Sequence, residues 1–285
     1  MEYPEIMQFE ANPALEGMAE LLPDIVYSRA GSEELKLTLI APWRAENDAV
    51  RRPLVVFIQG SAWTTPNINY EIPQLAELAR AGYVVATIDH RSSLNGHAFP
   101  AYLADTKTAI RFLRANAYLY GIDPARVCVY GTSSGGNTAL LVGLTGDDAE
   151  FKSDEYAEYS DAVNCVVECF GPSDLTALVA DSSEPNEEYT RIFEGLAGGS
   201  DMDDVLRRMS PMRRLRAGAK YPPFLIVHGD ADELVPYEQG LLMYRALIDH
   251  GADARMIRVS GAPHEGAFWS RALVDEIYAF IKQHV

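Results

Sequence analysis

The chain has 285 residues, 48% of them hydrophobic, and a formal net charge of −17, which is the composition of an ordinary globular protein. Its 21 Gly, 16 Pro and 3 Cys exclude collagen-like and disulfide-stapled proteins. The acidic balance disfavours binding to nucleic-acid phosphates and to anionic lipid surfaces. The first basic residue is Arg29, and a secretory signal begins with basic residues, so we expect none in this sequence. We therefore expect a cytoplasmic protein with neither a nucleic-acid nor a membrane partner.

Short apolar runs alternate with longer amphipathic stretches along the chain. Segments 24–29 and 35–40 alternate polar and apolar residues, as half-buried antiparallel strands do. Further strands are predicted at 54–58, 83–88, 127–130, 162–170, 223–227 and 255–259, and helices at 70–81, 102–120, 134–144, 237–250 and 268–283. Because strands alternate with helices, we predict an α/β fold with a mostly parallel central sheet, flanking helices and an antiparallel edge.

Two segments stand outside this alternation. Residues 173–210 form an acidic stretch with Gly and Pro that is too long for a simple loop. We predict a lid or cap over the functional site; a solvated insertion without a role is the alternative. Residues 1–23 are predicted as an N-terminal strap, with a dimer arm as the alternative. We otherwise treat residues 1–285 as a single domain, and the sequence leaves a homo-oligomer open.

The strongest local motif is Gly131-Thr132-Ser133-Ser134-Gly135. It lies between a predicted buried strand and a predicted helix, the context of a G-x-S-x-G nucleophile elbow. Glycines two residues before and after the serine remove side chains that would clash where strand and helix approach. Ser133 has glycine at both positions and Ser134 does not. We therefore predict Ser133 as the nucleophile.

A serine hydroxyl needs a base, and in this order of elements the acid and then the histidine follow the serine. His264 lies between the last predicted strand and the last predicted helix, where such a base belongs. The other downstream histidines fit structural, capping or terminal positions: His228, His250 and His284. Three carboxylates that follow the strand at 223–227 compete for the acid: Asp230, Asp232 and Glu233. Spacing alone does not select among them.

An acyl-transfer site also needs donors for the oxyanion. One is expected from the backbone N–H of Ser134, and others from the loop 59–63 after the first parallel strand. Trp63 ends this loop and Trp269 follows the His264 segment. We predict both as substrate-binding residues that stack on a sugar or a phenolic acyl group; core packing is the alternative for each.

The chain resembles the α/β-hydrolase superfamily and, within it, the BD-FAE-like carbohydrate esterases, from about residue 24 to the C-terminus. The resemblance rests on the elbow and on the segments 57–63, 89–91, 99–105, 120–126, 170–175 and 228–236. It implies Asp232 as the acid, because the family pattern is His-Gly-x-x-Asp followed by Val-Pro. It implies hydrolysis of a small-molecule ester, an acetylated or feruloylated saccharide or a similar small ester. Relatives usually carry His-Gly-Gly-Gly-Trp where this chain has residues 59–63, and Asp-Tyr-Arg where it has 89–91.

The expected mechanism is two-step acyl transfer. Ser133 attacks the ester, His264 accepts its proton, and Asp232 orients the imidazole. The N–H groups of Ser61, Ala62 and Ser134 are expected to hold the oxyanion. No metal or organic cofactor is implied. The alternatives are a general short-chain carboxylesterase, a serine peptidase of the same fold, and a non-catalytic binding protein on a hydrolase scaffold.

Overall fold

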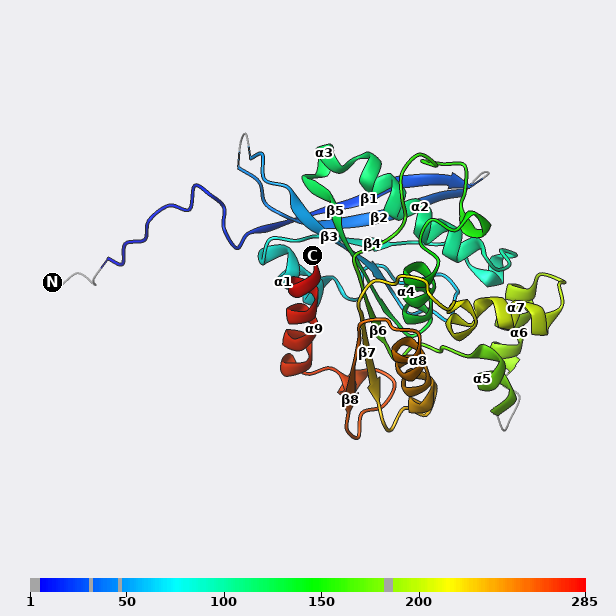
Figure 1. Cartoon of the computed structure of the whole chain (residues 1–285). Coiled ribbons are helices and arrows are strands. Elements are labelled where there is room, and N and C mark those ends of the chain that lie inside the picture. Colours follow the sequence, from blue (N-terminus) through cyan, green and yellow to red (C-terminus); the bar gives the residue numbers. More distant parts are fainter. Residues whose placement is uncertain (1–5, 31–32, 46–47, 182–186) are drawn as a thin grey trace.

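A mixed β-sheet runs through the protein in the computed structural model, which describes residues 6–30, 33–45, 48–181 and 187–285 (Figure 1). The described strands are β1 (Ala19–Ala30), β2 (Glu33–Pro42), β3 (Arg52–Ile58), β4 (Val84–Ile88), β5 (Ile122–Thr132), β6 (Cys165–Cys169), β7 (Phe224–Gly229) and β8 (Ala254–Val259). Their order across the sheet is β1-β2-β4-β3-β5-β6-β7-β8. Pairs β1–β2 and β2–β4 are antiparallel and all later pairs are parallel, which confirms the predicted antiparallel edge.

Helices cover both faces of this sheet (Figure 1). The described helices are α1 (Ile72–Arg80), α2 (Ala101–Ala115), α3 (Ala117–Tyr120), α4 (Ser134–Leu144), α5 (Leu175–Asp181), α6 (Glu187–Ala197), α7 (Met202–Met209), α8 (Tyr237–Asp249) and α9 (Arg271–His284). Short 3-10 helices lie at Ser93–Asn95 (η1), Ala149–Phe151 (η2), Pro211–Arg214 (η3) and Gly266–Phe268 (η4). Helices α1 and α9 pack on one face, and α2, α4 and α8 pack on the other. The central strands are therefore buried on both sides, which explains their continuous apolar sequences.

The helix predicted over 102–120 is two helices. Helix α2 ends at Ala115, and α3 begins at Ala117. Between them the side-chain amide of Asn116 donates to the carbonyl oxygen of Phe112 at 2.8 Å. An Asn side chain competes in this way with the backbone for helix hydrogen bonds, and α2 ends at this residue.

The insertion at 173–210 contains three short helices in its described part, α5, α6 and α7, which lie together at one side of the molecule (Figure 1). Residues 182–186 of the predicted lid lie outside the described residues. The predicted N-terminal strap also falls partly outside them, at residues 1–5. Residues 19–23 belong to edge strand β1, and residues 6–18 run away from the sheet (Figure 1). Among the described residues, no helix combines the length and apolar character needed to cross a bilayer.

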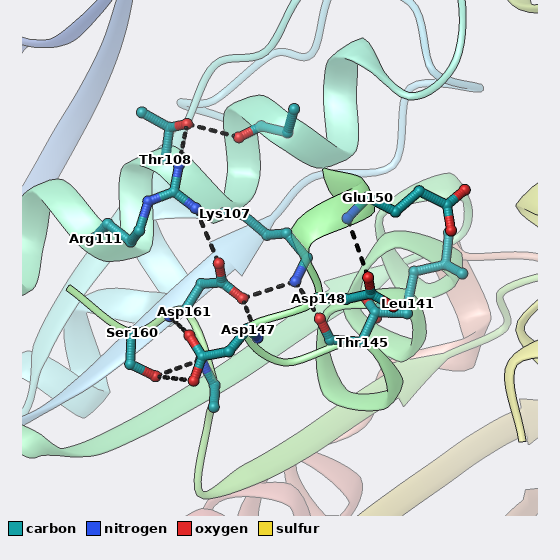
Figure 2. Close-up of polar contacts among 12 residues, drawn as sticks. Lys107, Thr108, Arg111, Leu141, Thr145, Asp147, Asp148, Glu150, Ser160 and Asp161 are labelled. Carbon is teal, nitrogen blue, oxygen red and sulfur yellow. Dashed lines mark hydrogen bonds and ion pairs between the residues drawn. The ribbon is translucent and has the colours of Figure 1, made fainter. Parts of the chain in front are cut away.

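A fully buried ionic network fixes the segment that follows α4 (Figure 2). The carboxylate of Asp161 accepts from Lys107 Nζ at 2.7 Å and from Arg111 Nη1 at 2.9 Å. All three side chains are completely excluded from solvent. Asp161 also accepts the backbone N–H of Asp147 at 2.9 Å, so the network joins α2 to both ends of the long connection between α4 and β6.

Candidate active site

Ser133 lies at the sharp junction between β5 and α4. Its backbone has φ 53° and ψ −124°, a strained conformation for a residue with a side chain. A Cβ on Gly131 would lie 2.0 Å from the carbonyl oxygen of Gly135, and a Cβ on Gly135 would lie 2.0 Å from that of Ile58. Both distances are far below van der Waals contact. The flanking glycines are therefore required by the close approach of strand and helix, as the sequence predicts.

Three polar side chains meet at the carboxyl ends of the parallel strands. Ser133 follows β5, Asp232 follows β7 and His264 follows β8. His264 Nε2 lies 3.0 Å from Ser133 Oγ, and His264 Nδ1 lies 2.7 Å from Asp232 Oδ2. The three predicted residues are thus joined in one hydrogen-bonded row. The loop after β3 ends at the same edge of the sheet, because β3 pairs in parallel with β5.

The geometry distinguishes the carboxylates that the sequence left open. Asp230 accepts from Arg258 and from the backbone N–H of Gly261, each at 2.5 Å, and does not reach the imidazole. Glu233 is exposed. Only Asp232 of the three contacts His264.

The charged form of Asp232 is strongly stabilised. Its Oδ1 accepts the backbone N–H groups of Leu234 and Val235, each at 2.9 Å. Burial raises the pKa of this carboxyl, but hydrogen bonds from His228, His264 and Val235 outweigh burial and hold the pKa well below its usual range. Asp232 therefore stays ionised at neutral pH and can balance a charged His264.

The loop after β3 lies directly against the serine. A Cβ on Gly60 would lie 2.8 Å from Ser133 Cβ. Ala62 and Trp63 both have left-handed backbones, with φ of 50° and 57°. Among the described residues, the N–H groups of Ala62 and Ser134 have no hydrogen-bond acceptor. Both N–H groups are thus available to an incoming group beside Ser133.

Ser61 differs from the prediction. Its N–H donates to Ser134 Oγ at 2.9 Å and is therefore already bonded. The accepting hydroxyl belongs to the residue after Ser133, and sequence spacing alone gives no sign of this contact. Two of the three predicted donors remain free.

A cavity of about 610 Å³ opens beside Ser133 and His264. Its walls are mostly apolar and include Leu178, Val179, Phe193, Met202, Leu206 and Val235. The first five of these belong to the insertion at 173–210, on α5, α6 and α7. The insertion therefore forms one wall of the cavity.

The two tryptophans have different positions. Trp63 lines the cavity and packs against Tyr102 and Phe193, with ring centroids 6.2 Å apart in each case. Trp269 does not line it. The Trp269 ring packs edge-on against Phe268 at 4.9 Å, in the cluster beneath α1 and α9. The structure thus gives Trp269 the core-packing role that was the alternative to substrate binding.

Phe170 is a site residue that the sequence reasoning did not assign. Its ring lies edge-on to His264, with centroids 4.7 Å apart. The carbonyl oxygen of its neighbour Cys169 accepts the N–H of Ser133 at 2.9 Å, so the end of β6 supports both Ser133 and His264. Two sequence signals point to Phe170: its position at the end of a buried strand, before Gly171, and its place at the start of segment 170–175, which carries the family resemblance. His250 has the capping position that was expected, with Nδ1 2.7 Å from Ala246 O at the end of α8.

The parallel sheet, the strained serine elbow and the order of the site residues along the chain are those of an α/β-hydrolase. The chain belongs to the BD-FAE family, whose model matches residues 42–247.

Two of the solved structures that resemble nearly the whole chain are esterases. A truncated carbohydrate esterase from gut microbiota has a TM-score of 0.79 and 28% identity, over 96% of this chain and 99% of that one. The butyrate-bound esterase Est2 of Thermogutta terrifontis has a TM-score of 0.75 and 26% identity, over 95% of both chains. Esterase LipC of Mycobacterium tuberculosis is 33% identical over 70% of this chain and 50% of its own. The chain spans about half the length of the curated relatives it matches.

Proposed function

We propose that the protein is a serine carboxylic ester hydrolase. The observation that carries this proposal is the row of hydrogen-bonding distances from Ser133 Oγ through His264 to Asp232, at 3.0 and 2.7 Å. Ser133 is the nucleophile, His264 the general base and Asp232 the group that orients the imidazole and balances its charge. The esterase names of LipC and Est2 support the same class of reaction.

The reaction proceeds in two acyl-transfer steps. His264 Nε2 takes the proton of Ser133 as Oγ bonds to the ester carbonyl carbon. The resulting oxyanion accepts hydrogen bonds from the N–H groups of Ala62 and Ser134. The C–O bond to the alcohol then breaks, and the alcohol leaves with the proton from His264. Water attacks the acyl-enzyme by the same route and releases the acid and free Ser133.

The apolar lining of the cavity favours binding of an apolar acyl group. Its walls carry aliphatic and aromatic side chains from α5, α6 and α7, together with Trp63. Such walls stabilise apolar surface and give little to a sugar hydroxyl. We therefore propose esters in which a feruloyl-like or short aliphatic acyl group enters the cavity and a saccharide alcohol remains at its mouth. The similarity to a carbohydrate esterase supports the saccharide alcohol, and the butyrate bound to Est2 supports the short aliphatic acyl group.

The insertion at 173–210 is proposed as the lid of this cavity. It supplies wall residues from three helices, so its removal or opening would expose the acyl site to water.

Initial rates of the wild type and of Ser133→Ala on acetyl, butyryl, octanoyl and feruloyl esters, with an acetylated xylo-oligosaccharide, test the proposal. We expect Ser133→Ala to lose all but a residual rate. We also expect Trp63→Ala to change the ratio of feruloyl to acetyl turnover. Activity confined to simple short esters would keep the mechanism and discard the saccharide.

Full activity of Ser133→Ala would overturn the mechanism. Serine-dependent cleavage of peptides instead of esters would favour the peptidase alternative. Failure of a fluorophosphonate to label Ser133, together with no turnover of any ester, would favour a binding protein.

A further inference from the structure

A second imidazole lies behind the proposed catalytic row. His228, the penultimate residue of β7, is completely buried. Its Nε2 lies 2.8 Å from the carbonyl oxygen of Val235 and 3.4 Å from Asp232 Oδ2. Both neighbours are acceptors, so Nε2 carries the hydrogen. His228 therefore approaches the same carboxylate oxygen that contacts His264.

A buried carboxyl on the neighbouring strand shares a face of the sheet with His228. In the register of β6 and β7, Glu168 pairs with Ile226. Alternate strand residues share a face, so Glu168 and His228 project to the same side of the sheet. Glu168 is completely buried, and its Oε1 accepts the backbone N–H of Gly171.

Two buried polar atoms in this region lack a hydrogen-bond partner among the described residues, Glu168 Oε2 and His228 Nδ1. Helix α8 presents a glycine at Nδ1: a Cβ on Gly240 would lie 2.7 Å from that atom. The other group of α8 near His228 is the Tyr237 ring, edge-on at 6.0 Å. Among the described residues, the titratable or charged side chains that face His228 are those of Asp232, Glu168 and Tyr237, together with Arg258, its register partner on β8, which lies over the Tyr237 ring.

We propose that His228 is a positioning residue for the reaction. Its Nε2–H lies between the carbonyl oxygen of Val235 and Asp232 Oδ2, the oxygen that also contacts His264. From there it helps to fix the direction of the carboxylate and limits how strongly Asp232 attracts the proton of His264. Glu168 is the buried counter-group of the same imidazole. This inference rests on the proposed function, because it requires His264 to act as the base.

Charge balance supports the arrangement. Burial raises the pKa of Glu168 to about 7, although the nearby His228 opposes this shift. Burial lowers the pKa of His228, but the hydrogen bond with Asp232 and the charge of Glu168 outweigh burial and raise it. Both shifts favour the protonated form of these two buried groups. A donor that competes for Oδ2 weakens the attraction of Asp232 for the hydrogen on His264 Nδ1.

Variants of His228 that differ in their ability to donate test this inference. The amide nitrogen of His228→Gln can replace Nε2–H, whereas His228→Leu has similar bulk and no donor. We would measure kcat and KM from pH 5 to 9, with the melting temperature, on the ester that the wild type hydrolyses fastest. For His228→Leu we expect kcat to fall roughly ten- to a hundredfold, as for other partners that orient a site residue, with KM changed less than about threefold.

We also expect the acidic limb of the His228→Leu pH profile to move to higher pH by about 0.5 to 1 unit. His228→Gln should restore the limb and most of kcat. If His228→Leu does not fold, His228→Asn replaces it, because its shorter amide matches Nδ1 and cannot reach Asp232. Asp161→Asn is the control for lost buried polar contacts, since it disrupts the separate network on α2. It should lower the melting temperature and leave the pH profile unchanged.

An unchanged pH limb and kcat in a folded variant without the donor would overturn the inference and leave His228 a purely structural residue. The inference would also be overturned if His228→Gln were as impaired as His228→Leu. Failure of the proposed function can be told apart from failure of this inference, because only the former would leave Ser133→Ala fully active.

Discussion

The backbone N–H of Ser61 donates a hydrogen bond to Ser134 Oγ across 2.9 Å, beside the nucleophile. This bond joins the loop after β3 to the first residue of α4. It uses one of the donors expected for the oxyanion, and it makes the hydroxyl of Ser134 part of the scaffold of the site.

Ser134→Ala should therefore lower stability more than catalysis. The variant loses one largely buried hydrogen bond, which typically contributes about 1 kcal/mol to the free energy of unfolding. The backbone N–H of residue 134 remains, and the N–H of Ser61 becomes free. We expect kcat to stay within about threefold of the wild type, since loss of a true oxyanion donor costs roughly a hundred- to a thousandfold. Steady-state kinetics and urea denaturation provide both numbers. A hundredfold loss of kcat would mean that the Ser134 hydroxyl itself stabilises the oxyanion.

The comparison between Ser133 and Ser61 explains what the sequence can predict. Gly131 and Gly135 are needed by contacts within one strand–turn–helix unit, so a local motif identifies the elbow. The order of Ser133, Asp232 and His264 follows from the topology of the sheet. The Ser61 bond depends instead on how one loop meets the start of a helix 73 residues later, and no local pattern records this.

Other differences have the same origin. The approach of Glu168 to His228 depends on the register between β6 and β7. Trp269 follows His264 closely in sequence, but its side chain turns into the cluster beneath α9. The segment positions of the strands could be predicted because both faces of the sheet are covered, which leaves apolar runs in the sequence.

Asp161→Ala should destabilise the protein severely. The change leaves the cations of Lys107 and Arg111 buried without their shared carboxylate (Figure 2). Removing one partner of a buried ion pair typically costs about 3–5 kcal/mol, because an uncompensated charge remains. We expect a loss of this size in urea denaturation at pH 7. Arg126→Ala is a matched control, because its pair with Asp123 is partly exposed. Equal losses in the two variants would contradict the argument from burial.

Glu71→Gln should reduce the pH dependence of stability. Glu71 is 7% exposed, and burial, together with the charge of Glu265, raises its pKa from 4.5 to about 7. Because the folded state binds this proton more tightly than the unfolded state, its contribution to stability is complete below pH 4.5 and is lost as the pH rises through 7. We expect the wild type to lose more unfolding free energy than Glu71→Gln between pH 5.5 and 8, by roughly 1–3 kcal/mol.

Urea denaturation at the two pH values measures this difference. Glu238→Gln, which removes an exposed carboxylate from α8, is the control for a simple change of net charge. Parallel pH dependence in the wild type and Glu71→Gln would show that Glu71 does not hold its proton in the folded protein.

At position 265 we expect the glycine variant to be more stable than the alanine variant, the reverse of the usual order. Its backbone has φ 92° and ψ −173°, a region that side chains strongly disfavour, and it directly follows His264. At ordinary positions Gly is less stable than Ala by roughly 0.5–1 kcal/mol, because it loses more freedom on folding. Here Glu265→Ala keeps the strain of a Cβ, whereas Glu265→Gly removes it. Since such strain costs roughly 1–3 kcal/mol, we expect Glu265→Gly to be the more stable of the two by about 1 kcal/mol. Both variants lack the carboxylate, so their difference in urea denaturation isolates the backbone, and a less stable glycine variant would mean that residue 265 carries no strain.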